Sequence, residues 1–391
     1  MNQPSFIPTL SPLRGFAALI VAIFHFQGVV GSLVPEGNML FAKFYLMVDL
    51  FFVLSGFIMV HVYGQWFQDS IDRKRFMTFM KARFARLYPL HLFTFLYILG
   101  WVIVLWTKLG FDEVPVNIQK VFSPWSIPTN LLLIQAWGMH LEASWNLPAW
   151  SISVEWFLYL VFPFMFSFLS KSSATTKWIL AGTITGTLLV IMYVIQPIYA
   201  ELYNAAQTVS EGPILPQAQN SIDLVTGFAL LRGLCGFVSG MLIYELYRKD
   251  WQRERLKKGF WFWGICGFLI VMWSGDWLPD VFTVGLFSLL ILHAAYVEGW
   301  TRTILNNRVC TYLGDISYSI YMVHIPIMGS FLLYSIMNGQ TDMQTPDIDL
   351  KTKWVAASVF MLLLIGIASL TYRFIEKPMR RWLKRNLNQR S

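Results

Sequence analysis

Apolar runs about 20 residues long recur along the whole chain, and they restrict the fold more than any other feature. A helix of that length spans the hydrocarbon core of a bilayer, because each residue advances it by about 1.5 Å. Helices of soluble proteins keep a polar face, and most of these runs have none. Of the 391 residues, 56% are hydrophobic and 13% charged. The chain is therefore predicted to be an all-α, polytopic helical membrane protein, since β-barrels show short alternating segments instead.

We predict about ten transmembrane helices in a single domain over residues 1–391, with no fused soluble domain. The predicted helices cover residues 12–33, 40–63, 88–107, 149–169, 178–197, 223–247, 259–275, 279–297, 310–336 and 353–383. A further apolar stretch at 121–139 is broken by Pro124 and Pro128, which predicts a re-entrant or interfacial segment. The first run is long and has no small-residue cleavage site, so no cleaved signal peptide is expected.

Basic residues concentrate in alternate predicted loops. One set of loops contains 72–86, 248–258 and 376–390, and it carries 24 of the 30 lysines and arginines when Arg14 is counted with it. The other set carries five beside many acids, and Arg232 lies inside a span. Because cytoplasmic loops collect Lys and Arg, both termini are predicted to be cytoplasmic. The same rule explains the net charge of +8, so the expected partner is the lipid bilayer and not nucleic acid. The three cysteines lack metal-ligand spacing, and no metal site is predicted.

Five ionisable residues fall at one depth near the membrane midplane, each in a different predicted span: His25, Asp49, Glu155, Arg232 and His324. An ionisable side chain that faces lipid costs several kcal/mol, so each is expected to face a cavity or a partner. One interpretation is a structural ion pair between Arg232 and Asp49 or Glu155. The interpretation that we favour is a functional cavity, because two histidines can exchange protons near neutral pH.

Arg14 and His25 are eleven residues apart, which is just over three helical turns and places both on one face. Arg14 then lies at the cytoplasmic mouth, and His25 lies about 16 Å deeper. Acyl-coenzyme A suits such a face, because it has phosphates at one end, a long thin arm and a reactive thioester at the tip. Taken singly, Arg14 is also explained as an interfacial anchor and His25 as a hydrogen-bonded core histidine.

Six motifs occur in a fixed order along nearly the whole chain. They are "LRGFAALIVAIFHF" (13–26), "VDLFFVLSGFIM" (48–59), "RFARLYPLH" (83–91), "WNLPAWSISVEWFLYLVFP" (145–163), "LGDISYSIYMVHIPI" (313–327) and "RFIEKPMRR" (373–381). In these motifs the chain resembles the acyltransferase-3 family of bacterial integral-membrane O-acyltransferases, which includes O-antigen and exopolysaccharide acetylases.

The resemblance implies that His25 is the catalytic histidine, that Arg14 is its paired arginine, and that Arg83 and Arg86 bind the acyl donor. Asp49, Glu155 and His324 also fall in motifs of the family. The expected enzyme lies in the bacterial inner membrane and moves an acetyl or other short acyl group from acetyl-CoA, or another acyl-CoA, to a hydroxyl of a surface glycan or lipid-linked saccharide.

Two mechanisms stay open for this expected reaction. His25 acts as a general base with Glu155 or Asp49 orienting its imidazole, or it accepts the acyl group itself. Arg232 and His324 are expected to support the site. Tyr318 and Tyr321 either donate hydrogen bonds to the sugar or thioester, or pack as aromatic residues. The donor is a substrate, and no permanently bound cofactor is expected. The sequence leaves open whether a separate extracytoplasmic protein completes the transfer.

A secondary transporter is the alternative function, because intramembrane His, Asp, Glu and Arg also build proton relays. Transporters often have repeated halves with helices broken at matching positions. We find no such correspondence between the halves of this chain, and acyl transfer is therefore favoured. These sequence patterns do not identify the acceptor, the exact acyl group or the oligomeric state.

Overall fold

Helices account for most of the chain in the computed structural model, which describes residues 6–110, 112–114, 116–206, 221–338 and 348–388 and has no strand in these ranges. Eight helical segments in this part are long and apolar enough to cross a membrane. They are α1 (Leu10–Val30), η1 (Ala42–Leu46) with α2 (Met47–Phe67), α3 (Arg73–Leu109), α6 (Ala149–Lys171), α7 (Ala174–Val190) with η3 (Ile191–Ile195) and α8 (Gln196–Ala206), α9 (Ala229–Arg248), α15 (Ser317–Met337), and α16 (Leu350–Thr371) with η4 (Tyr372–Glu376) and α17 (Lys377–Asn388). The predicted all-α, polytopic membrane fold is confirmed.

The two remaining predicted spans correspond to shorter helices. Residues 259–275 form α11 (Gly259–Ser274), which has 16 residues. Residues 279–297 form α12 (Asp280–Tyr296), which has 17 residues and is followed by α13 (Gly299–Leu305) at an angle of 100°. The short helix α10 (Arg253–Leu256) precedes them. By length and composition the described part therefore supports eight spans, or nine if the bent pair counts as one, against about ten predicted.

Two of the predicted boundaries differ most from the structure. Residues 72–86 were predicted to be a loop, but they form the first half of α3, which continues through Pro89 to a length of 37 residues. Asp72 caps this helix by accepting a hydrogen bond from the Arg75 N–H at 3.0 Å, and the segment is rich in good helix formers. Residues 310–336 were predicted to be one helix, but α14 (Arg308–Asp315) and α15 are separated at Ile316.

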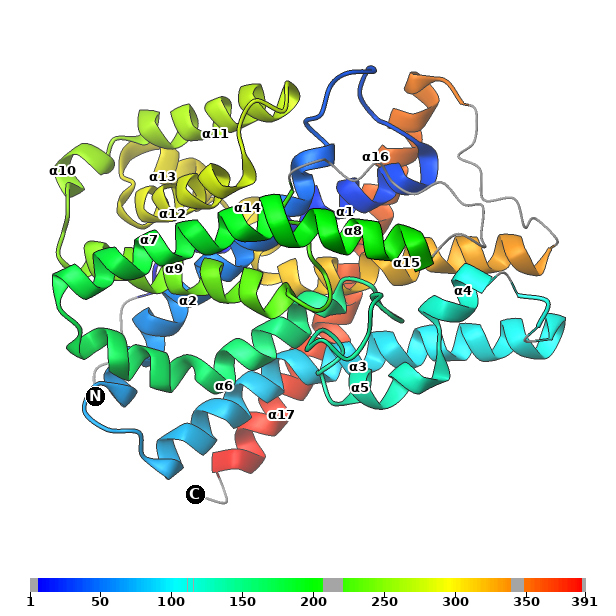
Figure 1. Cartoon of the computed structure of the whole chain (residues 1–391), viewed down its shortest axis with the longest axis horizontal. Coiled ribbons are helices and arrows are strands. Elements are labelled where there is room, and N and C mark those ends of the chain that lie inside the picture. Colours follow the sequence, from blue (N-terminus) through cyan, green and yellow to red (C-terminus); the bar gives the residue numbers. More distant parts are fainter. Residues whose placement is uncertain (1–5, 111, 115, 207–220, 339–347, 389–391) are drawn as a thin grey trace.

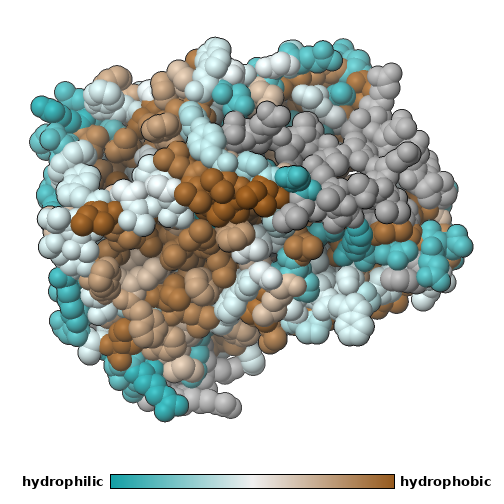
Figure 2. Space-filling view, in the orientation of Figure 1, coloured by the Kyte–Doolittle hydropathy of each residue, from teal (hydrophilic) through white to brown (hydrophobic). Residues whose placement is uncertain are grey.

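The connections between helices alternate between two ends of the bundle. In Figure 1 the α2–α3, α6–α7 and α9–α10 connections lie at the left of the view, whereas α4 (Val116–Val121) and the end of α15 lie at the right. Figure 2 shows apolar residues gathered over α6 and α7, with hydrophilic residues along the left edge. Trp178 of α7 is 75% exposed and Leu362 of α16 is 74% exposed. A lipid environment accounts for apolar side chains exposed to this degree.

Small residues bring two central helices into close contact. A Cβ added at Gly56 of α2 would lie 1.9 Å from the Phe237 carbonyl oxygen, and one at Gly240 of α9 would lie 1.9 Å from the Val53 carbonyl oxygen. Glycine at these positions allows the two backbones to touch, as in other membrane helix pairs. The contact fixes α2 beside α9, and α1 packs in turn against α14 and α15.

The segment around 121–139 folds into short helices, which are η2 (Pro124–Ser126), α5 (Ile127–Leu131) and the end of α4. The chain that follows this segment contains Asn146, whose side-chain amide donates at 3.1 Å to the Met322 carbonyl of α15. That carbonyl lacks its usual helical partner because Pro326, four residues later, has no N–H. The hydrogen bond therefore ties the segment to α15 two residues before His324.

Candidate active site

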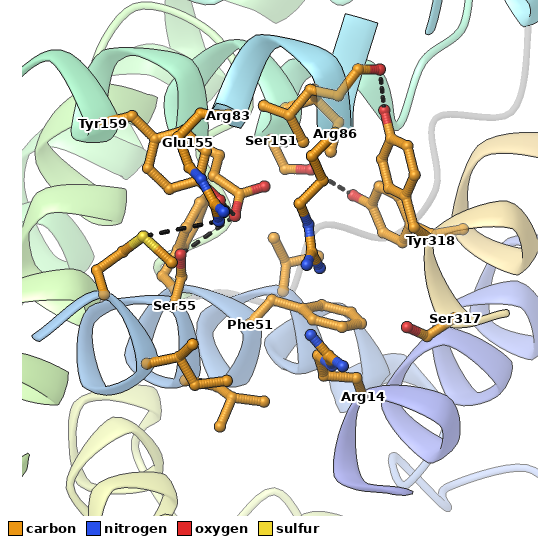
Figure 3. Close-up of a pocket in the computed structure, with 18 residues that line it drawn as sticks. Arg14, Phe51, Ser55, Arg83, Arg86, Ser151, Glu155, Tyr159, Ser317 and Tyr318 are labelled. Atoms are coloured by element: carbon orange, nitrogen blue, oxygen red, sulfur yellow. Dashed lines mark hydrogen bonds between the residues drawn. The ribbon is translucent and has the colours of Figure 1, made fainter. Parts of the chain in front are cut away.

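A cavity of about 80 Å³ lies among α1, α2, α3, α6 and α15 (Figure 3). We call it the arginine cavity, because three of its lining side chains are arginines. Its lining residues are Arg14, Val48, Phe51, Phe52, Leu54, Ser55, Ile58, Met59, Arg83, Arg86, Leu87, Ser151, Ile152, Glu155, Tyr159, Ser317, Tyr318 and Tyr321. Glu155 is the one carboxylate in this set, so the lining carries three positive charges against one negative charge.

Two of the arginines face each other across the cavity. The Arg14 and Arg86 guanidinium groups point toward one another (Figure 3), and their charges repel. Arg14 donates to Ser11 Oγ at 3.1 Å, while its buried Nε has no hydrogen-bond partner among the described residues. The described structure contains no ion pair for either arginine. Two opposed guanidinium groups with unused donors form a site for a multiply charged anion.

The third arginine is held in place by aromatic residues. Arg83 Nη2 donates to the Tyr63 hydroxyl at 2.7 Å, and its guanidinium lies over the rings of Tyr63 and Tyr159 at 4.9 and 5.6 Å from their centroids. Nearby, Glu155 accepts hydrogen bonds from Ser55 Oγ at 3.1 Å and from the Tyr159 hydroxyl. These contacts explain how the carboxylate is held at this depth.

Both predicted tyrosines line the cavity, and their hydroxyls are bound to protein groups. The Tyr318 hydroxyl donates at 2.6 Å to the Leu87 carbonyl of α3. The Tyr321 hydroxyl lies 2.7 Å from Ser151 Oγ and donates to the Pro148 carbonyl at 3.1 Å. The structure therefore places both rings at the cavity wall with their hydroxyls anchored to neighbouring helices.

His25 and His324 form a pair across α1 and α15. His25 Nδ1 lies 3.0 Å from the Val21 carbonyl oxygen and 3.2 Å from His324 Nε2. Because a carbonyl can only accept, the hydrogen-bond partners assign the proton of neutral His25 to Nδ1. His324 Nε2 is then the acceptor of the pair. This assignment leaves the lone pair of His25 Nε2 free to act as a base or nucleophile.

The histidine pair lies next to the arginine cavity but does not line it. The Tyr321 ring is at the cavity wall, and its centroid lies 5.8 Å from that of His324, which in turn lies 5.0 Å from that of His25. Tyr321 and His324 are three residues apart on α15 and share a face of this helix. Successive ring contacts therefore connect Tyr321 at the cavity wall to His324, and His324 to His25.

The five midplane residues separate into distinct groups. Arg232 Nε and Nη2 donate to the Asp49 carboxylate at 3.0 and 2.8 Å, and Arg232 Nη1 donates to Asp223 at 2.7 Å. Arg232 is 0% exposed and Asp49 1% exposed. This is the structural ion pair that the sequence left open. Among the described residues no carboxylate is hydrogen-bonded to His25; the Val21 carbonyl and His324 hold its imidazole, a role expected for Asp49 or Glu155.

Sequence reasoning missed several polar residues near the site. Asp223 was predicted to begin a span, but it lies in the non-helical segment before α9, and its separation of nine residues from Arg232 is not a helix-neighbour spacing that would have indicated their ion pair. Tyr159 follows Glu155 by four residues, which is the spacing of neighbours on a helix face. Glu376 lies in the "RFIEKPMRR" motif, where the π-helical turn η4 places it against Ser319 Oγ at 2.9 Å. Its charge acts on Arg14 and Arg86 from behind the cavity.

Comparison with known proteins gives consistent matches over most of the chain. A family model described as an acyltransferase domain matches residues 10–373. Acyltransferase MdmB of Streptomyces mycarofaciens is 27% identical over 406 residues, covering 97% of this chain and 93% of that protein. O-acetyltransferase OatA of Staphylococcus aureus is 24% identical and covers 97% of this chain, which spans 58% of OatA. Protein 2 in the picA locus of Rhizobium radiobacter is 32% identical over 161 residues, covering 39% of this chain and 79% of that protein. No solved structure matches the chain.

Proposed function

The chain belongs to the acyltransferase-3 family, and from that premise we propose that it moves an acetyl or other short acyl group from cytoplasmic acyl-CoA to a hydroxyl of a surface glycan or lipid-linked saccharide. The observation that carries the proposal is the arginine cavity, which ends one helical turn from the His25–His324 pair. The names of the relatives support acyl transfer and give no support to the transporter alternative.

The donor binds with its phosphates at Arg14, Arg83 and Arg86. Guanidinium groups form paired, charge-assisted hydrogen bonds with phosphate oxygens, and the excess positive charge of the cavity favours an anion over a neutral sugar. The pantetheine arm then extends along α1 toward His25. Arg14 and His25 are both within this helix and about 16 Å apart along its axis, so the arm bridges the anion site and the base.

The reaction follows from the free lone pair of His25 Nε2. His25 takes the proton of the acceptor hydroxyl as its oxygen attacks the thioester carbonyl. The C–O bond forms, the C–S bond breaks, and the departing sulfur receives the proton from His25 as coenzyme A leaves. His324 holds the ring in this tautomer through the 3.2 Å contact. In the covalent alternative, Nε2 first takes the acyl group and releases it to the hydroxyl.

The orientation of the protein in the membrane follows from the distribution of lysines and arginines among its loops. The loops at the left of Figure 1 carry most of the basic residues, so we place them, with both termini, on the cytoplasmic side of the bacterial inner membrane. Acyl-CoA then enters from this side, and the glycan approaches the histidine pair from the other. A separate extracytoplasmic transferase could receive the acyl group where the acceptor lies beyond the membrane.

Labelled acetyl transfer tests the proposal. Membranes containing the wild-type protein are incubated with radiolabelled acetyl-CoA and the lipid-linked glycan fraction of the host cells. His25→Gln is expected to lose transfer by at least about 100-fold, the range for removing a general base. Arg86→Gln is expected to raise KM for acetyl-CoA with a smaller change in kcat, because it removes a phosphate contact.

Two controls make these results specific. Arg302→Gln, at an exposed position on α13, should leave KM unchanged. His140 lies outside the arginine cavity, where its ring nitrogen Nε2 is 2.7 Å from the Thr129 hydroxyl, and His140→Gln should leave acetyl transfer unchanged. Full transfer by His25→Gln would contradict both mechanisms. Label trapped on the protein without acceptor, and lost in His25→Gln, would select the covalent route.

A further inference from the structure

We propose that Phe51 and Tyr321 form an aromatic constriction between the arginine cavity and the His25–His324 pair, and that this constriction restricts the transferred group to short acyl chains. The inference rests on the proposed function and identifies the residues that select the acyl group. Both residues line the cavity, Phe51 from α2 and Tyr321 from α15.

The two rings touch each other at the end of the cavity nearer the midplane residues, since Phe51 is two residues from Asp49 on α2 and Tyr321 is three residues from His324 on α15. Their centroids are 5.7 Å apart and their planes are inclined at 71°, an edge-to-face arrangement. Tyr321 is 5% exposed, and the next ring beyond it is that of His324, at 5.8 Å. A thioester that reaches His25 from the arginines must therefore pass these rings or lie against them.

Tyr321 is held firmly in this position. Its hydroxyl bonds to Ser151 Oγ and to the Pro148 carbonyl, both at the start of α6. Ser151 Oγ lies 3.0 Å from the same carbonyl oxygen, so the two hydroxyl protons are shared among three mutual contacts of a small closed network. A swing of the Tyr321 ring would break these buried hydrogen bonds, and a buried carbonyl without its donors is costly. The ring therefore acts as a fixed wall.

Fixed rings at this point select acyl groups by the length of their tail. An acetyl group presents a single methyl beyond the reacting carbonyl, whereas a hexanoyl group adds four methylenes that must displace packed atoms. On the far side of the two rings His324 is 0% exposed, so a longer tail has to lie against Phe51 and Tyr321 themselves. Interiors packed this closely accept extra methylenes only with strain. Short acyl groups fit, and longer ones must move Phe51 or Tyr321.

The test compares acetyl-CoA, butyryl-CoA and hexanoyl-CoA as donors to the same glycan fraction. The full-length protein is reconstituted in vesicles, and kcat/KM is measured for each donor. Tyr321→Leu and Phe51→Leu are expected to raise the hexanoyl-to-acetyl ratio of kcat/KM by at least about tenfold, since even one methylene changes such ratios by 10- to 200-fold. Phe51→Ala should raise the ratio further.

Matched variants distinguish the constriction from general loosening. Tyr334→Leu removes a tyrosine of the same helix that is 61% exposed on its outer face, and it should keep the wild-type ratio. Tyr321→Phe retains the ring but loses the hydroxyl bonds that hold it, so its hexanoyl-to-acetyl ratio should lie between those of the wild type and Tyr321→Leu. If Phe51→Ala fails to fold, Phe51→Leu and Tyr321→Leu, which retain a large apolar side chain, carry the comparison.

The outcomes separate the inference from the proposed function. An unchanged ratio in the folded leucine variants overturns the constriction, as does a wild-type protein that transfers hexanoyl as readily as acetyl. An equal rise in Tyr334→Leu also overturns it. If the wild type transfers none of the three acyl groups, the proposed function itself fails, and the inference fails with it.

Discussion

Replacing Asp49 with asparagine separates a structural from a catalytic role for this carboxylate. Arg232 binds it through two donors at 3.0 and 2.8 Å, and both side chains are at most 1% exposed. Removing one partner of a buried ion pair costs about 3–5 kcal/mol. Arg232 keeps Asp223 at 2.7 Å, and asparagine still accepts one hydrogen bond. We therefore expect Asp49→Asn to lower the free energy of unfolding by about 3 kcal/mol, the lower end of that range.

Two measurements on the same samples test this expectation. Tryptophan fluorescence follows denaturant unfolding of the wild type and of Asp49→Asn in detergent micelles. Labelled acetyl transfer is then measured per folded molecule, and its kcat should stay close to that of the wild type. Asp223→Asn is the matched control. The Asp223 side chain is 33% exposed, so solvent screening should limit its loss of stability to about 1 kcal/mol.

The opposite pattern would exclude a purely structural role for Asp49. If Asp49→Asn unfolds at the wild-type denaturant concentration but transfers acetyl at least about 100-fold more slowly, Asp49 takes part in the chemistry. Such a result would return Asp49 to the role of a catalytic carboxylate. It would also mean that the ion pair rearranges when substrate binds.

Two further predictions concern packing and charge. Gly56→Ala places a Cβ 1.9 Å from an α9 carbonyl oxygen and should lower the unfolding free energy by about 2 kcal/mol. Gly28→Ala is the control, because a Cβ there has no atom within 4 Å. Equal losses of stability in the two variants would contradict the close contact between α2 and α9. Lys43→Met leaves the fully buried Asp280 carboxylate without the cation that now lies at 3.0 Å. Lys43→Met should cost about 3 kcal/mol of unfolding free energy and therefore lower the midpoint temperature of thermal unfolding, measured as loss of the monodisperse size-exclusion peak on heating. An unaltered midpoint would show that this ion pair does not stabilise the protein.

Much of the fold could be predicted from the sequence, because a membrane span leaves a long apolar run. Each predicted span contains a helix, including the short α11 and α12. The errors occurred where tertiary contacts override a local signal. The helix predicted over 88–107 begins beside Pro89, yet α3 continues through this proline from Arg73. Residues 310–336 were predicted as one helix, although the chain turns at Ile316. The apolar pattern indicates neither feature: an interior proline removes one backbone hydrogen bond without ending the helix here, and the turn at Ile316 falls within an apolar run.

The sequence by itself determined distances along single helices. Arg14 and His25 belong to one regular helix, so their separation of about 16 Å follows from the rise per residue. The tertiary structure alone decided which charged and polar groups meet. His25 meets His324 across 299 positions, and Asp49 meets Arg232 across 183, while Glu155 bonds to Ser55 and Tyr159 instead. The reason is that helices apolar on every face have no polar stripe to set their rotation, so small packing contacts decide which side chains point inward.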